Sequence, residues 1–445
     1  MAKFDITSID TLKSKCQELG IDIPVTESPK VVSQTLSKPI TIGKHQSPNR
    51  CMIHPMEGFD AEFDGSPSEL SYRRYKKWAA GGAGIIWFEA TAVVPEGRSN
   101  PHQFWIHKEN VDKFANLVET TRKSAIEKYG KNHQLICVLQ LTHSGRYSNP
   151  QGIKRQPIIA FHDKFLDASI GIDINYPTVN DDYLKQLEDK FAESAVLAKQ
   201  AGFDAVDIKS CHRYLINELL AARLREGIYG GDFDNRTRFL LNVIDKSNDL
   251  LNEQIDIYIR LGCFDGEPEP FGWASSKENP PSPELTEVFQ LLKLLQQRNV
   301  SLISVTAGNP YYSPHINRPY TKELKGTQPP REHPLIGVSR LLNLSREIRQ
   351  NIDNDKIMIS SAGYSWLREF SGFVMAGTIL KNWTDIAGAG RLSFAYHNWP
   401  EDLITKGMLD KQKVCITCSL CTALMRKGGP TGCAVRDKEI YRIDD

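Results

Sequence analysis

Four cysteines gather near the end of the 445-residue sequence. They are Cys415, Cys418, Cys421 and Cys433. The other five of the nine cysteines are scattered singly, and a lone cysteine usually acts as a small hydrophobic residue. Three thiolates close together and a distant fourth can wrap an iron–sulfur cluster, whereas structural zinc usually takes two separated pairs. The spacing C-x2-C-x2-C-x11-C therefore favours an iron–sulfur cluster, with structural zinc as the alternative.

Charged and polar side chains form a second group, at the ends of predicted strands. Side chains two residues apart in a strand point to the same side, so the sequence DAVDIK predicts that Asp207 and Lys209 face the interior. The same alternation predicts that Arg260, Gln140 and Glu89 face inward on other strands. Each could be a buried residue satisfied by a neighbour, and Lys209 could pair with Asp207. Together they indicate a site for a large polar ligand with acceptors and a negative group.

Small residues follow the last two predicted strands. The sequences SSAGYSW and AGAGRLSF place alanine and glycine, and hence free backbone N–H groups, at strand-to-helix turns. In barrel enzymes the final βα loops and a helix N-terminus often hold a phosphate group. These turns therefore indicate a phosphate site beside the polar side chains.

The elements that must position these residues alternate between strands and helices. Short β-branched runs alternate with amphipathic stretches from about residue 48 to residue 395, with no linker between them. The predicted strands are 50–56, 84–91, 134–142, 204–209, 255–261, 301–307, 356–362 and 385–390. Eight strands with crossover helices close into a (β/α)8 TIM barrel, for which a doubly wound open sheet is the alternative.

Both ends of the chain fall outside the predicted barrel. The expected division is an N-terminal extension over 1–47, the barrel over 48–400 and a C-terminal cysteine-cluster segment over 401–445. In the extension, Ser8 and Asp10 could cap a short helix that ends at Gly20. We expect the extension to cover the bottom of the barrel.

The composition is that of an ordinary globular protein, with 40% hydrophobic and 24% charged residues. A formal net charge of +1 gives no electrostatic reason to expect a nucleic acid or a membrane surface as a partner. The sequence begins MAKFDITSIDTL, without a basic segment that leads into an apolar run, so we expect a cytoplasmic protein. Small molecules or proteins are the expected partners, and a homo-oligomer is left open.

Four motifs in the same order resemble the old yellow enzyme family of FMN-dependent NADH:flavin oxidoreductases. They are QLTHSGR (140–146), GFDAVDIKSCHRYLINELL (202–220), YGGDFDNRTRF (229–239) and GAGRLSF (388–394). The branch typified by 2,4-dienoyl-CoA reductase and trimethylamine dehydrogenase is the more similar one, because a cysteine cluster follows the barrel there too. In that branch the spacing C-x2-C-x3-C-x11-C holds a [4Fe-4S] cluster, and the present chain is one residue shorter in the second gap. The resemblance implies an FMN cofactor and a [4Fe-4S] cluster.

The resemblance also implies where FMN would bind. Gln140 matches the glutamine that hydrogen-bonds the flavin ring, and Arg260 matches the arginine near the N1 and O2 edge of the ring. Pro55, Met56 and Glu57 correspond to the segment under the ring, and Ala90 to the backbone contact after the second strand. The phosphate site of the family corresponds to Ser361, Ala362, Gly363, Gly390 and Arg391.

The catalytic motif of the family, HGAHGYL, reads KSCHRYL in this chain. The resemblance implies that Tyr214 protonates the substrate and that His212 is one of two groups that grip its carbonyl. Lys209 departs from the pattern, because the family usually has histidine there. Lysine supplies a compact full charge, which would favour an enolate-like intermediate or bind a carboxylate. The implied activity is an ene-reductase, with hydride from flavin N5 to the β-carbon and the proton from Tyr214 to the α-carbon.

The long segment 147–180, after the third strand, is expected to select the substrate. It carries Tyr147, Phe161, Phe165 and Tyr176. These aromatic side chains could equally pack within the loop.

The source of electrons and the direction of the reaction stay open. Relatives with the cluster continue into a flavin and nucleotide domain, but no GxGxxG follows a strand here, so we expect NAD(P)H or a separate electron-transfer protein as the donor. The enzyme could instead oxidise an amine or another C–H donor and pass electrons out through the cluster. In another class, Lys209 could form an imine as a Schiff-base lyase. The C-terminal segment could also be a zinc-stabilised docking module.

Overall fold

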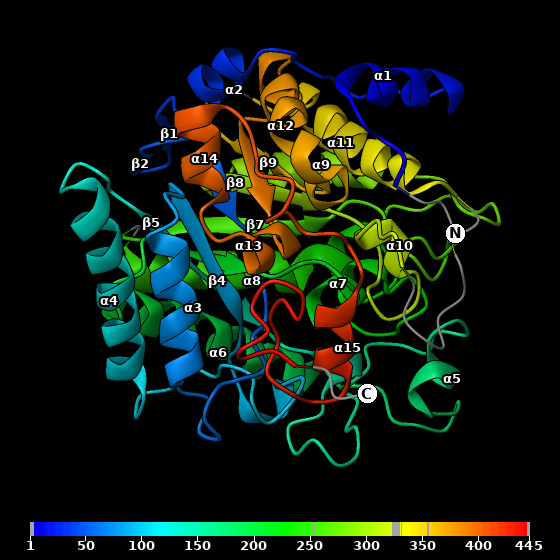
Figure 1. Ribbon diagram of the computed structural model, residues 1–445. Helices are drawn as coiled ribbons and strands as arrows, with labels where there is room; N and C mark the ends of the chain where they lie inside the picture. The colour runs from blue at the N-terminus through cyan, green and yellow to red at the C-terminus, as the bar shows by residue number, and fades with distance from the viewer. Residues whose placement is uncertain (1–3, 253, 323–329, 331, 354–355, 443–445) are drawn as a thin grey trace.

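Eight parallel strands form a closed barrel at the centre of the computed structural model (Figure 1). The structure describes residues 4–252, 254–322, 330, 332–353 and 356–442. The barrel strands are β3 (Cys51–Ile53), β4 (Ile85–Ala92), β5 (Ile136–Thr142), β6 (Ala205–Ile208), β7 (Asp256–Gly262), β8 (Val300–Thr306), β9 (Met358–Ser361) and β10 (Ile386–Ala389). Each overlaps a strand predicted from the sequence, and β10 pairs with β3 to close the ring. The (β/α)8 barrel is confirmed, and the open-sheet alternative is wrong.

Helices surround the barrel on its outer face (Figure 1). The longer ones are α3 (Glu69–Ala79), α4 (Val111–Tyr129), α6 (Asp181–Gln200), α8 (Phe233–Leu251), α9 (Thr286–Gln296), α11 (Pro334–Gln350) and α12 (Ser371–Leu380). Shorter helices are α5 (Asp167–Ile170), α7 (Leu215–Ala221), α10 (Pro314–Asn317), α13 (Arg391–Ala395) and α14 (Trp399–Lys406), with 3-10 turns η1 (Pro95–Gly97), η2 (Gly145–Tyr147) and η3 (Tyr364–Phe370). None of the helices in the described part of the chain combines the length and the apolar character needed to cross a membrane.

The core has two layers because side chains alternate along each strand. Within the barrel, Ile85, Trp87 and Tyr258 belong to one cluster of buried residues. Between the strands and the helices, Val206 and Ile208 belong to a larger cluster. This division places the polar members of the same strands near the barrel axis.

A short hairpin closes the amino end of the barrel. It consists of β1 (Ile40–Ile42) and β2 (His45–Ser47), which pair antiparallel. The backbone N–H of Lys44, at the tip of the hairpin, donates to Asp256 Oδ2 at 2.9 Å, at the start of β7. Ile42 lies in the buried cluster inside the barrel. The hairpin therefore plugs the end of the barrel opposite the carboxyl ends of the strands.

Two helices precede this hairpin, α1 (Ile9–Glu18) and α2 (Pro29–Leu36), and they lie beside α12 and α11 (Figure 1). Ser8 caps α1, because its side chain accepts a hydrogen bond from the backbone N–H of Thr11, and Asp10 lies in the first turn. These helices cover the flank of the barrel instead of its end.

The C-terminal segment lies across the carboxyl end of the barrel. It includes α15 (Leu420–Arg426), which lies close to α7 in the view of Figure 1. The backbone N–H of Thr431 donates to the carbonyl of Gly58 at 2.6 Å, and the N–H of Thr321 donates to the carbonyl of Thr417 at 3.1 Å. The cysteine-bearing segment is thus packed onto the loops that follow β3 and β8.

Candidate active site at the carboxyl end of the barrel

A buried carboxylate organises the strand-borne part of the site. Asp207 Oδ2 accepts hydrogen bonds from Gln140 Nε2 at 2.6 Å and from Trp87 Nε1 at 3.0 Å. Asp207 Oδ1 accepts the backbone N–H of Arg260 at 2.7 Å. Burial raises the pKa of Asp207 to about 6, and the hydrogen bond from Gln140 opposes that rise. The prediction that Asp207, Gln140 and Arg260 face inward is confirmed, and Asp207 fixes the orientation of the Gln140 amide.

Glu89, by contrast, does not face the barrel interior. Its carboxylate binds Arg74 Nη2 of α3 at 2.5 Å and accepts the backbone N–H of Gly58 at 2.8 Å. The pairing of β4 with β5 shifts register between Phe88 and Thr91. An irregularity of this kind interrupts the alternation of side chains, so the prediction for Glu89 is wrong.

Lys209 pairs with Glu57 and not with Asp207. Lys209 Nζ lies 3.7 Å from Glu57 Oε1 and 3.7 Å from the centroid of the Tyr214 ring. Burial lowers the pKa of Lys209, and the charge of Glu57 opposes that change. Burial raises the pKa of Glu57, and the charge of Lys209 opposes that change in turn. The ammonium group is thus held between a carboxylate and an aromatic face.

His212 lies on the turn between β6 and α7, where two successive residues have left-handed backbone conformations. The φ angles are 64° at His212 and 59° at Arg213, a region that residues with a Cβ adopt at some cost in free energy. His212 Nε2 lies 2.8 Å from Asn317 Nδ2 and 3.2 Å from Thr306 Oγ1. An amide nitrogen can only donate, so Nε2 is the acceptor and the ring proton resides on Nδ1. Burial, with the charges of Arg260 and Lys209, lowers the pKa of His212 and keeps the ring neutral.

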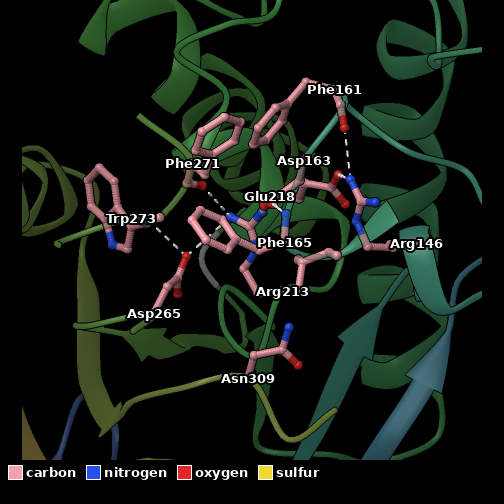
Figure 2. Close-up of polar contacts among 12 residues, drawn as sticks. Arg146, Phe161, Asp163, Phe165, Arg213, Glu218, Asp265, Phe271, Trp273 and Asn309 are labelled. Carbon is pink, nitrogen blue, oxygen red and sulfur yellow. Dashed lines mark hydrogen bonds and ion pairs between the residues drawn. The ribbon is translucent and has the colours of Figure 1, made fainter. Parts of the chain in front are cut away.

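A buried arginine anchors this turn. Arg213 Nη2 lies 2.6 Å from Asp163 Oδ2, and Nη1 lies 3.3 Å from Asp265 Oδ2 and donates to the carbonyl of Phe271 at 2.9 Å. Figure 2 shows Arg213 between these partners, which belong to the loops after β5 and β7. The family motif has glycine at this position, where a positive φ is easily adopted. In this chain buried ion pairs offset the strain of a left-handed arginine.

A second ion pair lies beside this anchor (Figure 2). Arg146 Nη2 lies 2.6 Å from Glu218 Oε1 and donates to the carbonyl of Phe161 at 2.8 Å. The ring of Phe165 packs edge-on against Phe271 with a centroid distance of 5.6 Å. The charged and aromatic residues of the long loop therefore join it to neighbouring loops.

Tyr214 stands at the N-terminus of α7 and contacts two further tyrosines. Its hydroxyl lies 3.2 Å from that of Tyr311. The Tyr311 ring stacks on Tyr147 with a centroid distance of 4.0 Å, and the Tyr147 hydroxyl accepts a hydrogen bond from Asn309 Nδ2 at 2.7 Å. Burial raises the pKa of Tyr214 well above its usual value. The sequence reasoning did not identify Tyr311, although the pair of tyrosines shortly after the end of β8 was a signal that could have found it.

One cavity at the carboxyl end of the barrel brings most of the predicted site residues together. The predicted residues that line it are Pro55, Met56, Glu57, Gln140, Lys209, His212, Tyr214, Arg260 and Arg391. The C-terminal segment closes one side through Cys421, Thr422, Met425, Arg426 and Thr431. The sequence did not predict this contribution.

Five predicted flavin contacts do not line this cavity, and four of them are Ala90, Ser361, Ala362 and Gly363. The carbonyl of Ala90 accepts a hydrogen bond from Gln103 Nε2 at 3.0 Å, and the hydroxyl of Ser361 lies 2.5 Å from that of Tyr364. Gly390 also lies outside the cavity lining. It packs so closely on Met56 that an added Cβ would lie 2.7 Å from the sulfur.

Positive charge collects at the side of the cavity next to the C-terminal segment. Arg318, Arg391 and Arg426 all line it. Burial, with the charges of Arg391 and Arg426, lowers the pKa of Arg318 to about 10. Arg391 Nη1 is buried and has no hydrogen-bond partner among the described residues. This arrangement fits an anionic group such as the phosphate of FMN.

The four cysteines line a second cavity, which shares Arg391, Phe394 and Cys421 with the first. All four are free thiols. Within the ranges that the structure describes, no group of three His, Cys, Asp or Glu side chains could hold a single metal ion. In a [4Fe-4S] cluster the four thiolates surround a larger inorganic core, and their convergence on one cavity is compatible with that.

Comparison with known proteins identifies the family of this chain. Residues 35–366 match the NADH:flavin oxidoreductase / NADH oxidase family. The chain belongs to this family. NADPH dehydrogenase of Bacillus pumilus (strain SAFR-032) is 30% identical over 267 residues, which cover 58% of this chain and 69% of the relative. NADPH dehydrogenase of Bacillus subtilis (strain 168) is 32% identical over 241 residues, covering 53% and 65%.

Solved structures with little sequence identity share the fold. A 2-naphthoyl-CoA reductase in complex with 2-naphthoyl-CoA has a TM-score of 0.71 at 17% identity, covering 91% of this chain and 57% of the neighbour. Morphinone reductase in complex with tetrahydroNAD has a TM-score of 0.63 at 19% identity, covering 92% and 98%. Histamine dehydrogenase from Rhizobium sp. 4-9 has a TM-score of 0.67 at 19% identity, covering 92% and 53%. The chain thus spans little more than half of the first and third neighbours.

Family membership confirms the resemblance and the class of enzyme. The chain is a flavin-dependent oxidoreductase of the old yellow enzyme type, for which FMN is the family cofactor. The Schiff-base lyase alternative therefore has no support, and Lys209 belongs to a flavoenzyme.

Proposed function

We propose that this protein reduces the C=C bond of an α,β-unsaturated carbonyl or carboxylate compound, with FMN in the main cavity and NAD(P)H as the reductant. The observation that carries the proposal is the convergence of Lys209, His212 and Tyr214 on the cavity that Gln140 and Arg260 also line. Lys209 and His212 can bind an oxygen atom of the substrate, and Tyr214 can supply a proton. This combination suits a reaction in which negative charge develops on the substrate.

The strand-borne residues would hold FMN. Gln140, oriented by Asp207, would hydrogen-bond the ring, and Arg260 would lie at the ring edge, held by His54 Nδ1 at 2.7 Å and Ser304 Oγ at 3.3 Å. Arg391 would bind the phosphate. When bound, FMN supplies the hydride for the β-carbon.

His212 and Lys209 would bind the substrate oxygen. The neutral ring of His212 presents its Nδ1–H as a donor, because Nε2 is occupied by Asn317 and Thr306. Lys209 adds a positive charge that is already desolvated and partnered with Glu57, so its attraction for a developing oxyanion is stronger than in water. A substrate carboxylate would benefit even more than a ketone oxygen, because it carries a full charge before the reaction.

Tyr214 would donate the proton to the α-carbon. Its raised pKa keeps the hydroxyl protonated at neutral pH. The ammonium group of Lys209, 3.7 Å from the ring centroid, would stabilise the phenolate that remains. Tyr214 favours this reaction over the oxidation of an amine, which has no need of a proton donor at this position.

The test separates the two halves of the reaction in the FMN-loaded enzyme. Stopped-flow measurements would follow flavin reduction by NADPH and flavin reoxidation by 2-cyclohexen-1-one or by cinnamate. In Tyr214→Phe we expect reoxidation to slow about 10²-fold or more, with flavin reduction unchanged. Tyr176→Phe, on the long loop outside the cavity, is the matched control. If Tyr214→Phe reoxidises at the wild-type rate with both probes, the assigned chemistry is wrong.

We further propose that Cys415, Cys418, Cys421 and Cys433 hold a [4Fe-4S] cluster, which would connect FMN to a separate electron-transfer protein. The support is the cysteine spacing, the resemblance to the cluster-containing branch and the single cavity that all four thiols line. Anaerobic purification should give about four irons and about four sulfides per chain, and Cys433→Ser should lose iron while retaining FMN. One zinc per chain without sulfide would overturn this assignment and leave FMN to be reduced by NAD(P)H alone.

A further inference from the structure

The hydroxyl of Tyr214 is connected to only one other group in the described part of the structure. That group is the hydroxyl of Tyr311, 3.2 Å away. Both tyrosines line the same cavity, but Tyr214 is only 5% exposed, whereas Tyr311 is half-buried and more accessible to water. A proton that leaves Tyr214 during each reaction cycle must be replaced before the next one. We infer that Tyr311 relays a proton from solvent to Tyr214, an inference that rests on the proposed role of Tyr214 as the proton donor.

The loop after β8 holds Tyr311 in the required orientation. The backbone N–H of Tyr311 donates to Asn309 Oδ1 at 2.9 Å, while Asn309 Nδ2 donates to the Tyr147 hydroxyl at 2.7 Å. The rings of Tyr311 and Tyr147 stack at 26°. Asn309 is fully buried and lies below the Arg213 anchor in Figure 2. One amide therefore fixes both the backbone of Tyr311 and the ring on which Tyr311 rests.

The exposure of the two tyrosines supports the direction of transfer, because Tyr214 is buried and Tyr311 is half-buried. Burial, with the charge of Glu57, raises the pKa of both hydroxyls, to about 12 for Tyr311 and well above its usual value for Tyr214, so both start protonated. The less buried Tyr311 is the natural donor to a Tyr214 phenolate. Phenol-to-phenolate transfer across a hydrogen bond needs no movement of the chain.

The proton balance of the relay is closed. The O–H bond of Tyr214 breaks as the C–H bond at the α-carbon forms. The O–H bond of Tyr311 then breaks as that of Tyr214 forms again, and Tyr311 recovers a proton from water at the cavity. No electrons are exchanged in the relay, and the net result is one solvent proton delivered to the substrate.

The experiment compares the first turnover with later ones in the FMN-loaded enzyme. Tyr311→Phe removes the hydroxyl but keeps the ring that stacks on Tyr147. With 2-cyclohexen-1-one as the probe, the first reoxidation of reduced flavin should occur at nearly the wild-type rate, because Tyr214 starts protonated. Steady-state turnover should then fall by about tenfold or more and show a larger solvent deuterium isotope effect. Tyr312→Phe, the exposed neighbour, is the control and should behave as wild type.

Three outcomes separate the possibilities. Wild-type steady-state turnover in Tyr311→Phe would overturn the relay. Equal slowing of the first and later turnovers would also overturn it, because Tyr311 would then only position Tyr214. Failure of the proposed function has a different signature, since Tyr214→Phe would then complete its first reoxidation at the wild-type rate.

Discussion

The two sides of the cavity are held in place by different interactions. On the strand side, Gln140 and Arg260 are fixed by hydrogen bonds to Asp207 between adjacent strands. On the loop side, the turn that carries His212 and Tyr214 is fixed by Arg213, whose ion-pair partners lie on two other loops. The positions of the side chains on the strand side depend on the register of the strands, whereas the position of the turn on the loop side depends on buried ion pairs.

This difference has an energetic consequence. A hydrogen bond within the barrel is supported by the strands on either side, so the loss of one partner leaves the backbone ladder intact. A buried ion pair has no such support, and removal of one partner leaves the other charge desolvated and uncompensated. The loop side should therefore be much more sensitive to single substitutions than the strand side.

The largest effect is expected from Arg213→Ala on the loop side. It would leave the buried carboxylates of Asp163 and Asp265 without their common partner. We expect the free energy of unfolding to fall by about 3–5 kcal/mol, measured by urea denaturation of the purified protein. The control is Lys190→Ala, which removes an exposed pair with Glu193 and should change stability by less than about 1 kcal/mol. Similar losses for the two variants would contradict the comparison.

Arg213→Gly sharpens the same prediction. Glycine adopts the φ of 59° without strain but also loses the ion pairs. It should be more stable than Arg213→Ala by about 1 kcal/mol, yet less stable than the wild type. A glycine variant as stable as wild type would show that the ion pairs only offset strain.

An intermediate effect, with a defined pH dependence, is expected from Asp207→Asn on the strand side. The carboxyl of Asp207 has a pKa of about 6 when folded and about 3.9 when unfolded. Between these values the folded state binds more protons, so this residue makes stability fall as the pH rises from about 4 to 6. The total change is about 2–3 kcal/mol.

The measurement is the difference in free energy of unfolding between wild type and Asp207→Asn at several pH values, with equal FMN loading. As the pH rises through this window, the wild type should lose stability relative to Asp207→Asn. Above the window the difference in free energy of unfolding should stay constant. A constant difference from pH 4 to 7 would mean that Asp207 keeps an ordinary pKa. The same measurement on Asp256→Asn, at the amino end of the barrel, gives the pH dependence for a carboxyl outside the site.

The same contrast explains what the sequence could predict. The eight strands and the inward direction of Gln140, Asp207 and Arg260 follow from alternation, which is a local property. The prediction for Glu89 failed because a register shift in β4 cannot be recognised from local alternation. Asp207 was the wrong candidate partner for Lys209. The actual partner, Glu57, follows a different strand, so alternation within one strand could not identify it.

Residues on the loop side were less accessible to sequence reasoning. The contacts of Tyr311 and of the C-terminal segment depend on the folding of chain regions that have no period of their own. The strain at Arg213 had a signal, because arginine replaces glycine in the family motif. That signal pointed to a positive φ but could not reveal Asp163 and Asp265 as the compensating partners.

The smallest effect is expected for a surface ion pair outside both sides of the cavity, between α3 and the C-terminal segment. Arg73 Nη1 and Nη2 each lie 2.7 Å from the carboxylate of Asp437, but both side chains are partly exposed, at 28% and 20%. Water and ions screen this pair, so Arg73→Met should lower stability by only about 0.5–1 kcal/mol, and the loss should shrink in high salt. Lys77→Met removes a longer contact with the same carboxylate, at 3.7 Å, and should have less effect. Asp437 follows Cys433 closely in the sequence. A much larger loss of stability in Arg73→Met, or a loss of iron with it, would show that this exposed pair holds the cysteine segment on the barrel. Burial would then not be what separates strong ion pairs from weak ones in this protein.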